Sequence, residues 1–142
     1  MSGKVAMADV DIAATPDRVW AALTDPAQIE KYMMGAQVET DWQVGSPISW
    51  KGEFQGQRYE DRGEILEYEP NRRLGMTHFS PLSGAEDRPE NYHRVVFELE
   101  DRADVTHVAL RQDGNASEEE AAHSSRNWQL MLEGLKDVVE KH

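Results

Sequence analysis

Short runs in which apolar and polar residues alternate occur at the start and through the middle of the chain, and this pattern predicts β-strands. The run Val5–Ala13 places Val10 and Ile12 on one side and aspartates on the other. We expect a half-buried strand there, because successive side chains of a strand point to opposite faces.

Between positions 36 and 112, turns that contain glycine or proline separate further runs of the same period. Clean alternation is found in Ile48–Phe54, Leu74–His78 and Val95–Leu99. Such closely spaced turns predict an antiparallel meander of about six strands. In Arg58–Tyr68 two adjacent large apolar residues break the alternation, so we expect a bulge or burial on both faces.

Two short helices are predicted between the first strand and the meander. Thr15, Pro16 and Asp17 are typical of a helix start, since threonine can cap, proline suits the first turn and aspartate suits the positive end of the helix dipole. An Asp-Pro dipeptide then ends this helix, and a second helical segment follows over Ala27–Tyr32.

A long C-terminal helix is the clearest element. Ser117 and Glu120 have the spacing of a capping box. An apolar stripe that a sheet has to cover then recurs at helical spacing, formed by Ala121, Trp128, Leu132, Leu135 and Val139. Leu130 lies on the other side and is expected to be exposed. Gly134 costs the helix on the order of 1 kcal/mol relative to alanine, which indicates a close contact there.

Together these elements predict an α+β fold in which a curved, seven-stranded antiparallel sheet wraps around the C-terminal helix, with two short helices after the first strand. A straight helix touches a curved sheet along a line, which leaves space toward its ends. A space lined by apolar side chains with few polar groups is typical of a small-molecule site. At 142 residues we expect one domain, spanning 5–141.

Composition excludes several classes of function. The chain has 15 Lys and Arg against 27 Asp and Glu, a formal charge of −12, so no nucleic-acid partner is expected. The absence of cysteine excludes disulfides, zinc–thiolate sites and thiol nucleophiles, and suits a reducing compartment. No segment approaches the ~20 apolar residues of a membrane helix, and the N-terminus lacks the features of a signal peptide. We therefore expect a cytoplasmic protein without membrane insertion.

Several motifs in combination resemble one known family. They are found in Ala14–Trp20, Ala22–Pro26, Gly63–Glu67, Pro70–Leu74, Val95–Glu100, Asn127–Gln129 and Leu132–Lys136. Through them nearly the whole chain resembles the homologues of the activator of heat shock protein 90 ATPase, within the START-like, Bet v 1-like (SRPBCC) superfamily. The resemblance implies a helix-grip fold around a hydrophobic cavity that takes lipids, polyketides or flavonoid-like aromatics. It also implies relatives that are cyclases or hydrolases.

The chain departs from many members of that family after the second short helix. Where they have an aromatic pair, this sequence has Tyr32-Met33-Met34. Methionine is flexible and polarizable, so a cavity mouth lined by it accepts apolar molecules of varied shape.

Strand parity and the helical stripe give a set of candidate ligand-binding residues, namely Tyr32, Met33, Trp50, Phe54, Met76, His78, His93, Val95, Phe97, Trp128 and Leu132. If the hairpin pairs position 76 with 95, His78 faces His93, and the two imidazoles would orient a phenol or a carboxylate at the end of the cavity. Other registers would leave both rings partly solvated at a sheet end. Trp128 is either a stacking surface for an aromatic ligand or part of the core.

The leading hypothesis is the binding of a small hydrophobic ligand rather than catalysis. No metal site is expected, because two histidines without a suitably spaced carboxylate give an incomplete set of ligands. No cofactor or catalytic residue is assigned. One alternative is a cyclase or hydrolase that uses the same cavity, with a histidine or a carboxylate such as Glu60, Glu64 or Glu67 moving a proton. Another is a module that interacts with a chaperone through its acidic surface.

The polar segment Ser83–Asn91 separates two of the predicted strands. It is either a lid over the cavity mouth or a plain connection.

Overall fold

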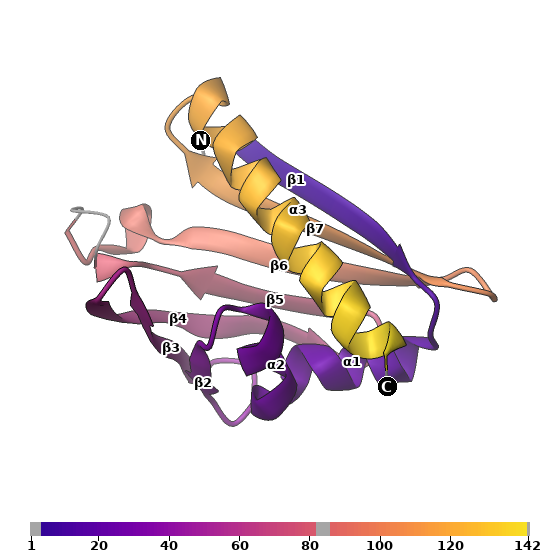
Figure 1. The fold of residues 1–142 in the computed structure, drawn as a ribbon. Helices are drawn as coiled ribbons and strands as arrows, with labels where there is room; N and C mark the ends of the chain where they lie inside the picture. The colour runs from indigo at the N-terminus through magenta and orange to yellow at the C-terminus, as the bar shows by residue number, and fades with distance from the viewer. Residues whose placement is uncertain (1–3, 82–85, 142) are drawn as a thin grey trace.

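The computed structural model describes residues 4–81 and 86–141 (Figure 1). In chain order its elements are β1 (Lys4–Ile12), α1 (Pro16–Thr24), α2 (Pro26–Tyr32), β2 (Gln37–Glu39), β3 (Pro47–Phe54), β4 (Gln57–Glu69), β5 (Arg73–His78), η2 (Pro89–Asn91), β6 (His93–Asp101), β7 (Thr106–Asn115) and α3 (Glu118–Glu140). Part of the segment Ser83–Asn91 lies outside the described residues.

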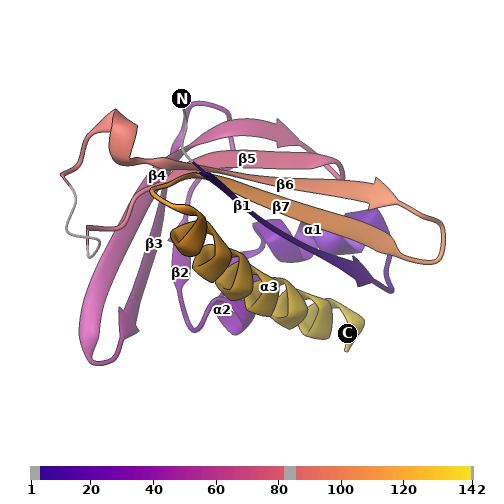
Figure 2. The same ribbon diagram turned by 90° about the horizontal axis from the view of Figure 1, so that it is seen from above.

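The strands form a seven-stranded antiparallel sheet in the order β1-β7-β6-β5-β4-β3-β2. Strands β2 to β7 are the predicted meander, and β1 joins it beside the last strand. Figure 2 shows the sheet bent around the side on which α2 and α3 lie. The predicted α+β helix-grip architecture is therefore confirmed, including the two short helices after the first strand.

Helix α3 packs mainly along β1, at one edge of the sheet (Figure 1). Polar side chains of the helix hydrogen-bond to the free edge of β1 and to the residue that follows it: Ser125 accepts from the Met7 amide, Gln129 exchanges two bonds with the Asp9 backbone, Lys136 donates to the Asp11 carbonyl and Glu140 accepts from the Ala13 amide. An edge strand otherwise presents unpaired backbone groups. This row of bonds, which we call the edge ladder, fixes the helix at the margin of the sheet.

The start of α3 follows the predicted capping box with one difference. The Ser117 hydroxyl accepts from the Glu120 amide at 3.1 Å. The Glu120 carboxylate reaches back to the amide of Ala116, one residue earlier than the box requires. Leu130 is 68% exposed, as the helical stripe predicted. None of the helices in the described part of the chain is long and apolar enough to cross a membrane.

Thr15 precedes α1 but does not cap it, so this part of the prediction was wrong. The nearby Thr15 hydroxyl is instead the main reason that the pKa of Asp17 is lowered. Helix α2, in contrast, has a side-chain cap, because the Asp25 carboxylate accepts a hydrogen bond from the Ala27 amide at 3.1 Å.

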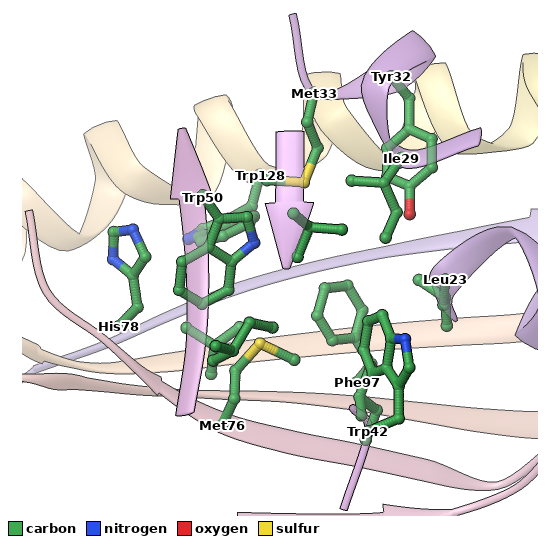
Figure 3. Close-up of a pocket in the computed structure, with 14 residues that line it drawn as sticks. Leu23, Ile29, Tyr32, Met33, Trp42, Trp50, Met76, His78, Phe97 and Trp128 are labelled. Carbon is green, nitrogen blue, oxygen red and sulfur yellow. The ribbon is translucent and has the colours of Figure 1, made fainter. Parts of the chain in front are cut away.

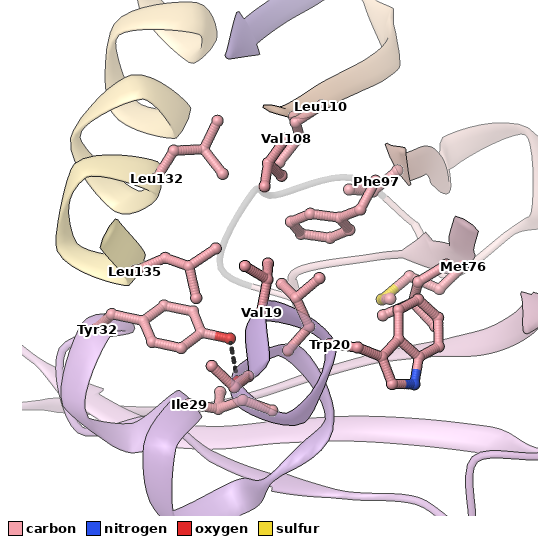
Figure 4. Close-up of a cluster of buried hydrophobic side chains, with 14 of the residues drawn as sticks. Val19, Trp20, Ile29, Tyr32, Met76, Phe97, Val108, Leu110, Leu132 and Leu135 are labelled. Atoms are coloured by element: carbon pink, nitrogen blue, oxygen red, sulfur yellow. Dashed lines mark hydrogen bonds between the residues drawn. The ribbon is translucent and has the colours of Figure 1, made fainter. Parts of the chain in front are cut away.

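The core lies between the sheet and the helices (Figure 4). Leu132 and Leu135 of α3, Val19 of α1, and Val108 and Leu110 of β7 are all fully buried in it. Since a buried leucine or valine contributes about 1.5–3 kcal/mol, this group supplies much of the free energy that holds the helices on the sheet.

Helices α2 and α3 meet closely at Gly134. A Cβ atom there would lie 3.3 Å from the Cβ of Tyr32. The missing side chain thus lets α2 approach, which confirms the expected close contact. Tyr32 also joins the two short helices, because its hydroxyl donates to the Ala22 carbonyl at 2.9 Å. Desolvation, with a smaller effect of the Asp25 charge, raises the pKa of Tyr32 far above its ordinary value.

Strand β4 contains the predicted bulge, since its register with β5 shifts between Ile65 and Glu67. Just before it, Gly63 lies against the β5 backbone, and a Cβ atom at Gly63 would be 1.8 Å from the carbonyl oxygen of Thr77. Only glycine fits here without separating the two strands.

Gly63→Ala is accordingly expected to lower the free energy of unfolding by about 2 kcal/mol or more, measured by urea denaturation. Gly52→Ala is the matched control. Its new methyl would meet the end of the Tyr59 side chain, which is able to move, rather than backbone. If both variants lost the same free energy of unfolding, this would contradict the close approach of β4 and β5.

Tyr32→Phe should lower the free energy of unfolding by about 1–2 kcal/mol at neutral pH, because the buried Ala22 carbonyl loses its donor. The folded state keeps Tyr32 neutral, whereas the unfolded chain ionises near the ordinary pKa of 10.0. The contribution of Tyr32 is complete below that pH and is lost as the pH rises above it. The difference between wild type and variant should therefore shrink above pH 10, and a constant difference would contradict this.

Candidate functional site

A small apolar cavity of about 60 Å³ lies between the sheet and the helices (Figure 3). Its lining comes from α1, α2, β2, β3, β5, β6, α3 and the segments after α2 and β2: Leu23, Ile29, Tyr32, Met33, Val38, Trp42, Ile48, Trp50, Leu74, Met76, His78, Val95, Phe97 and Trp128. His78 and Tyr32 are the ionisable side chains in this set. The cavity lies where α3, held along β1, does not cover the middle of the sheet.

The cavity is much smaller than the sequence led us to expect. Sites for small molecules usually measure roughly 300–1,000 Å³. In this conformation the space is several times smaller than such a site. The physical reason is the size of the lining side chains, since the indoles of Trp42 and Trp50 and the ring of Phe97 fill the volume that the curved sheet leaves.

A larger groove of about 650 Å³ lies outside this cavity, between the end of α2 and α3. It is lined by Tyr32, Met33, Met34, Gln112, Ser124, Asn127, Trp128, Leu130 and Met131. Tyr32, Met33 and Trp128 line both spaces. These three side chains are thus a common wall, and the cavity and the groove together are large enough for a small molecule.

The parts of this wall differ in how firmly they are held. Trp128 donates from Nε1 to Oε1 of Gln112 at 2.9 Å, and Gln112 is itself buried. The Tyr32 hydroxyl is bound to Ala22, so this residue presents its ring to the cavity. Met33 is partly buried and is packed only through apolar contacts. Met33 is therefore the side chain of the wall that moves at least cost.

Two residues near the cavity have left-handed backbone conformations that side chains rarely adopt. Trp42 has φ of 61° and packs its indole against the core, and Met34 has φ of 56° with its side chain 78% exposed. Such conformations cost of order 1–3 kcal/mol and need support from their surroundings. Burial of the Trp42 indole supplies that support in the segment between β2 and β3.

One polar pair lies at the end of the cavity. His78 Nε2 is 2.8 Å from Oδ2 of Asp61, and the His78 ring lies edge-on to Trp50 at 5.0 Å (Figure 3). Asp61 is opposite Trp50 in the β3–β4 ladder. The second oxygen of Asp61 and Nδ1 of His78 are both buried without a hydrogen-bond partner. The pair is thus only half satisfied.

The hairpin register predicted for β5 and β6 is confirmed, with Met76 opposite Val95 and His78 opposite His93. The structure nevertheless places the two imidazoles apart. His93 bonds through Nδ1 to the Asp113 carbonyl at 2.8 Å and lies against Gly114 of β7, whereas His78 bonds to β4. Each ring is drawn to a partner on its other neighbouring strand, and His93 is outside the cavity lining.

Of the other candidates from the sequence, Met33, Trp50, Met76, Val95, Phe97 and Trp128 lie in the cavity wall with Tyr32 and His78. Leu132 is fully buried in the core and does not reach the cavity. The side chain of Phe54 is outside the described part of the structure.

Lining residues that the sequence reasoning did not propose are Leu23, Ile29, Val38, Trp42, Ile48 and Leu74. Ile48 and Leu74 share the strand parity of Trp50 and Met76, so the same alternation could have identified them. Trp42 comes from an irregular segment, where no periodicity indicates direction. Within the described ranges, no group of three His, Cys, Asp or Glu residues is arranged to hold a metal ion.

Comparison with known proteins agrees with this architecture. The family described as "Activator of Hsp90 ATPase homolog 1-like protein" matches residues 13–140. A search of curated proteins found no match. Among solved structures, protein ChR145 from Cytophaga hutchinsonii is 44% identical, with a TM-score of 0.86 over 99% of this chain and 97% of that one.

Two more distant structures share the fold. Protein MLL2253 from Mesorhizobium loti is 22% identical, with a TM-score of 0.78 over 97% of this chain and 98% of the other. The Aha1 dimer from Colwellia psychrerythraea is 23% identical, with a TM-score of 0.74 and 96% of both chains covered. Since the match to the family spans nearly the whole sequence, the chain belongs to the Activator of Hsp90 ATPase homolog 1-like family.

Proposed function

We propose that this protein binds a small apolar molecule in the cavity and the adjoining part of the groove, after Met33 moves aside. The observation that carries the proposal is the common wall of Tyr32, Met33 and Trp128. Met33 is the most flexible of the three side chains that line both the apolar cavity and a groove about ten times larger, so its movement would join the two spaces into a binding site of ordinary size.

The energetics support such a step. Burying roughly 200 Å² of apolar ligand surface contributes about 5 kcal/mol at about 25 cal/mol per Å². Ordering the ligand and moving one methionine oppose this gain, so the dissociation constant is expected to be about 0.2 mM or weaker. The exposed side chains of Met34 and Leu130 on the groove extend the apolar surface outward, where an arriving ligand first makes contact.

The family and the helix-grip fold are consistent with ligand-binding proteins of the START-like and Bet v 1-like group. The alternatives drawn from the sequence, a cyclase or hydrolase and a chaperone-interacting module, stay predictions. No specific feature of the described residues favours either of them over binding.

A titration with N-phenyl-1-naphthylamine tests the proposal, because Trp42, Trp50 and Trp128, three of the four tryptophans in the chain, line the cavity and report on its occupancy. We expect saturable binding with quenching of tryptophan fluorescence. Met33→Ala should tighten binding, because it opens the wall. Met33→Trp should weaken it about tenfold or more, because it closes the wall.

Met7→Ala is the matched control, since Met7 is 61% exposed and lines neither space. The Met7→Ala variant should bind N-phenyl-1-naphthylamine with the same affinity as the wild type. The absence of saturable binding to the wild type and to Met33→Ala would overturn the proposal, as would equal effects of the changes at positions 33 and 7.

A further inference from the structure

We infer that the ligand of this site carries a neutral carbonyl group, as in an apolar ketone, ester or amide, and that the carbonyl oxygen accepts a hydrogen bond from Nε2 of Gln112 in the groove. This inference rests on the proposed function and narrows it to one chemical class.

Gln112 is a buried polar side chain that faces the groove. It lies on β7 between Ala6 of β1 and Val95 of β6, and it lines the groove although it is only 7% exposed. Val95 lines the cavity, and Trp128, which donates to Gln112, lines both spaces. Gln112 is therefore placed where the cavity and the groove adjoin.

The orientation of the Gln112 amide follows from its neighbour. An indole N–H can only donate, so the atom that accepts from Trp128 at 2.9 Å is the amide oxygen, Oε1. The two hydrogens of Nε2 make no hydrogen bond within the described residues. In that part of the chain, the side-chain atoms that are wholly buried without a partner belong to Asp61 and His78, not to Gln112. Nε2 is thus accessible, and the groove is the space that Gln112 lines.

The other polar side chains of the groove have donors that are already engaged. The Tyr32 and Ser124 hydroxyls each donate to an acceptor within the protein, and the amide nitrogen of Asn127 is 3.3 Å from a ring nitrogen of His123. Gln112 therefore supplies the buried donor that the groove offers to a ligand.

A donor at this place selects an acceptor. Apolar ligand surface that covers Nε2 would take it out of water and leave it unpaired, which is unfavourable. A carbonyl oxygen satisfies Nε2 and brings no hydrogen that needs a partner of its own. Sites built around such a bond discriminate strongly against analogues that lack it.

The charge of the site favours a neutral acceptor over an anion. Among the described residues that line the cavity or the groove, none is a lysine, an arginine, an aspartate or a glutamate, and the whole chain has a formal charge of −12. His78 is already paired with Asp61. A ligand carboxylate would have to leave water without a cation to receive it.

Displacement of N-phenyl-1-naphthylamine by three competitors of similar size tests the inference: 2-acetylnaphthalene, 2-isopropenylnaphthalene and 2-naphthoate, at neutral pH. We expect the ketone to bind about tenfold more tightly than the alkene, which has the same shape with a methylene group in place of the carbonyl oxygen. The anion 2-naphthoate should bind more weakly than the ketone.

Gln112→Met keeps the length of the side chain and removes the donor, so the ketone and the alkene should bind equally to this variant. The change also releases Trp128, and Trp128→Phe separates the two effects. It removes the indole N–H and leaves Nε2 of Gln112, so the affinity for both compounds falls while their ratio stays near tenfold. Gln43→Met makes the same substitution at an exposed glutamine that lines neither space, and it should leave the ratio unchanged.

Infrared spectroscopy of the wild type gives a measurement that needs no variant. The ligand is 2-acetylnaphthalene, isotope-labelled at its carbonyl carbon. A hydrogen bond weakens the C=O bond, so the band of the bound ketone should lie at lower frequency than in hexane. Circular dichroism shows whether each variant is folded, and if Gln112→Met is not, the position of this band decides.

Four results would each overturn the carbonyl inference while the proposed function stands. They are equal competition by ketone and alkene in the wild type, tightest binding by 2-naphthoate, a ratio that Gln112→Met and Trp128→Phe change to the same extent, and a carbonyl band at its hexane position. If neither the probe nor any competitor binds, the proposed function itself fails.

Discussion

The edge ladder between α3 and β1 is the interaction on which the rest of the molecule depends. Side chains from Ser125 to Glu140 replace several of the hydrogen bonds that a further strand would have made to β1 and to the residue after it. This pairing is directional, so it holds the helix at the margin of the sheet, whereas apolar burial alone would favour a central position. The middle of the concave face is consequently left to α1, α2 and irregular segments, and the cavity forms beneath them.

What fills that space decides the chemistry of the site. Large rings from Trp42, Trp50 and Phe97 occupy most of it, so the remaining cavity is small and a bound ligand has to displace a side chain. Met33 and Trp128 line both spaces and are the side chains next to an entering ligand, but they differ in how firmly they are held. Trp128 is tethered to Gln112 by a hydrogen bond, whereas Met33 has no polar tether. The same wall therefore contains one side chain held in place, Trp128, and one that is free to adapt, Met33.

Much of the fold was predictable, because it follows from local rules. Alternation identified the strands, the spacing of Ser117 and Glu120 located the start of α3, and counting outward from the hairpin loop gave the correct partner for His78. The candidate site was less accessible to such reasoning. Periodicity says which face a residue occupies, but not that Asp113 would bind His93 or that Trp42 would turn inward. The cavity volume depends on the packing of many rings, which no local pattern encodes.

The position of α3 also limits how copies of this chain can meet. The sheet has two margins, β1 and β2, and β2 spans only Gln37–Glu39. At β1 the helix already engages the N–H groups of Met7 and Asp9 and the C=O groups of Asp9 and Asp11, so an incoming strand would first have to displace α3 from the sheet. Pairing of sheets between two molecules is therefore disfavoured at β1. At the other margin only the three residues of β2 offer an edge for such pairing. Association through side-chain surfaces is the route that this architecture leaves open.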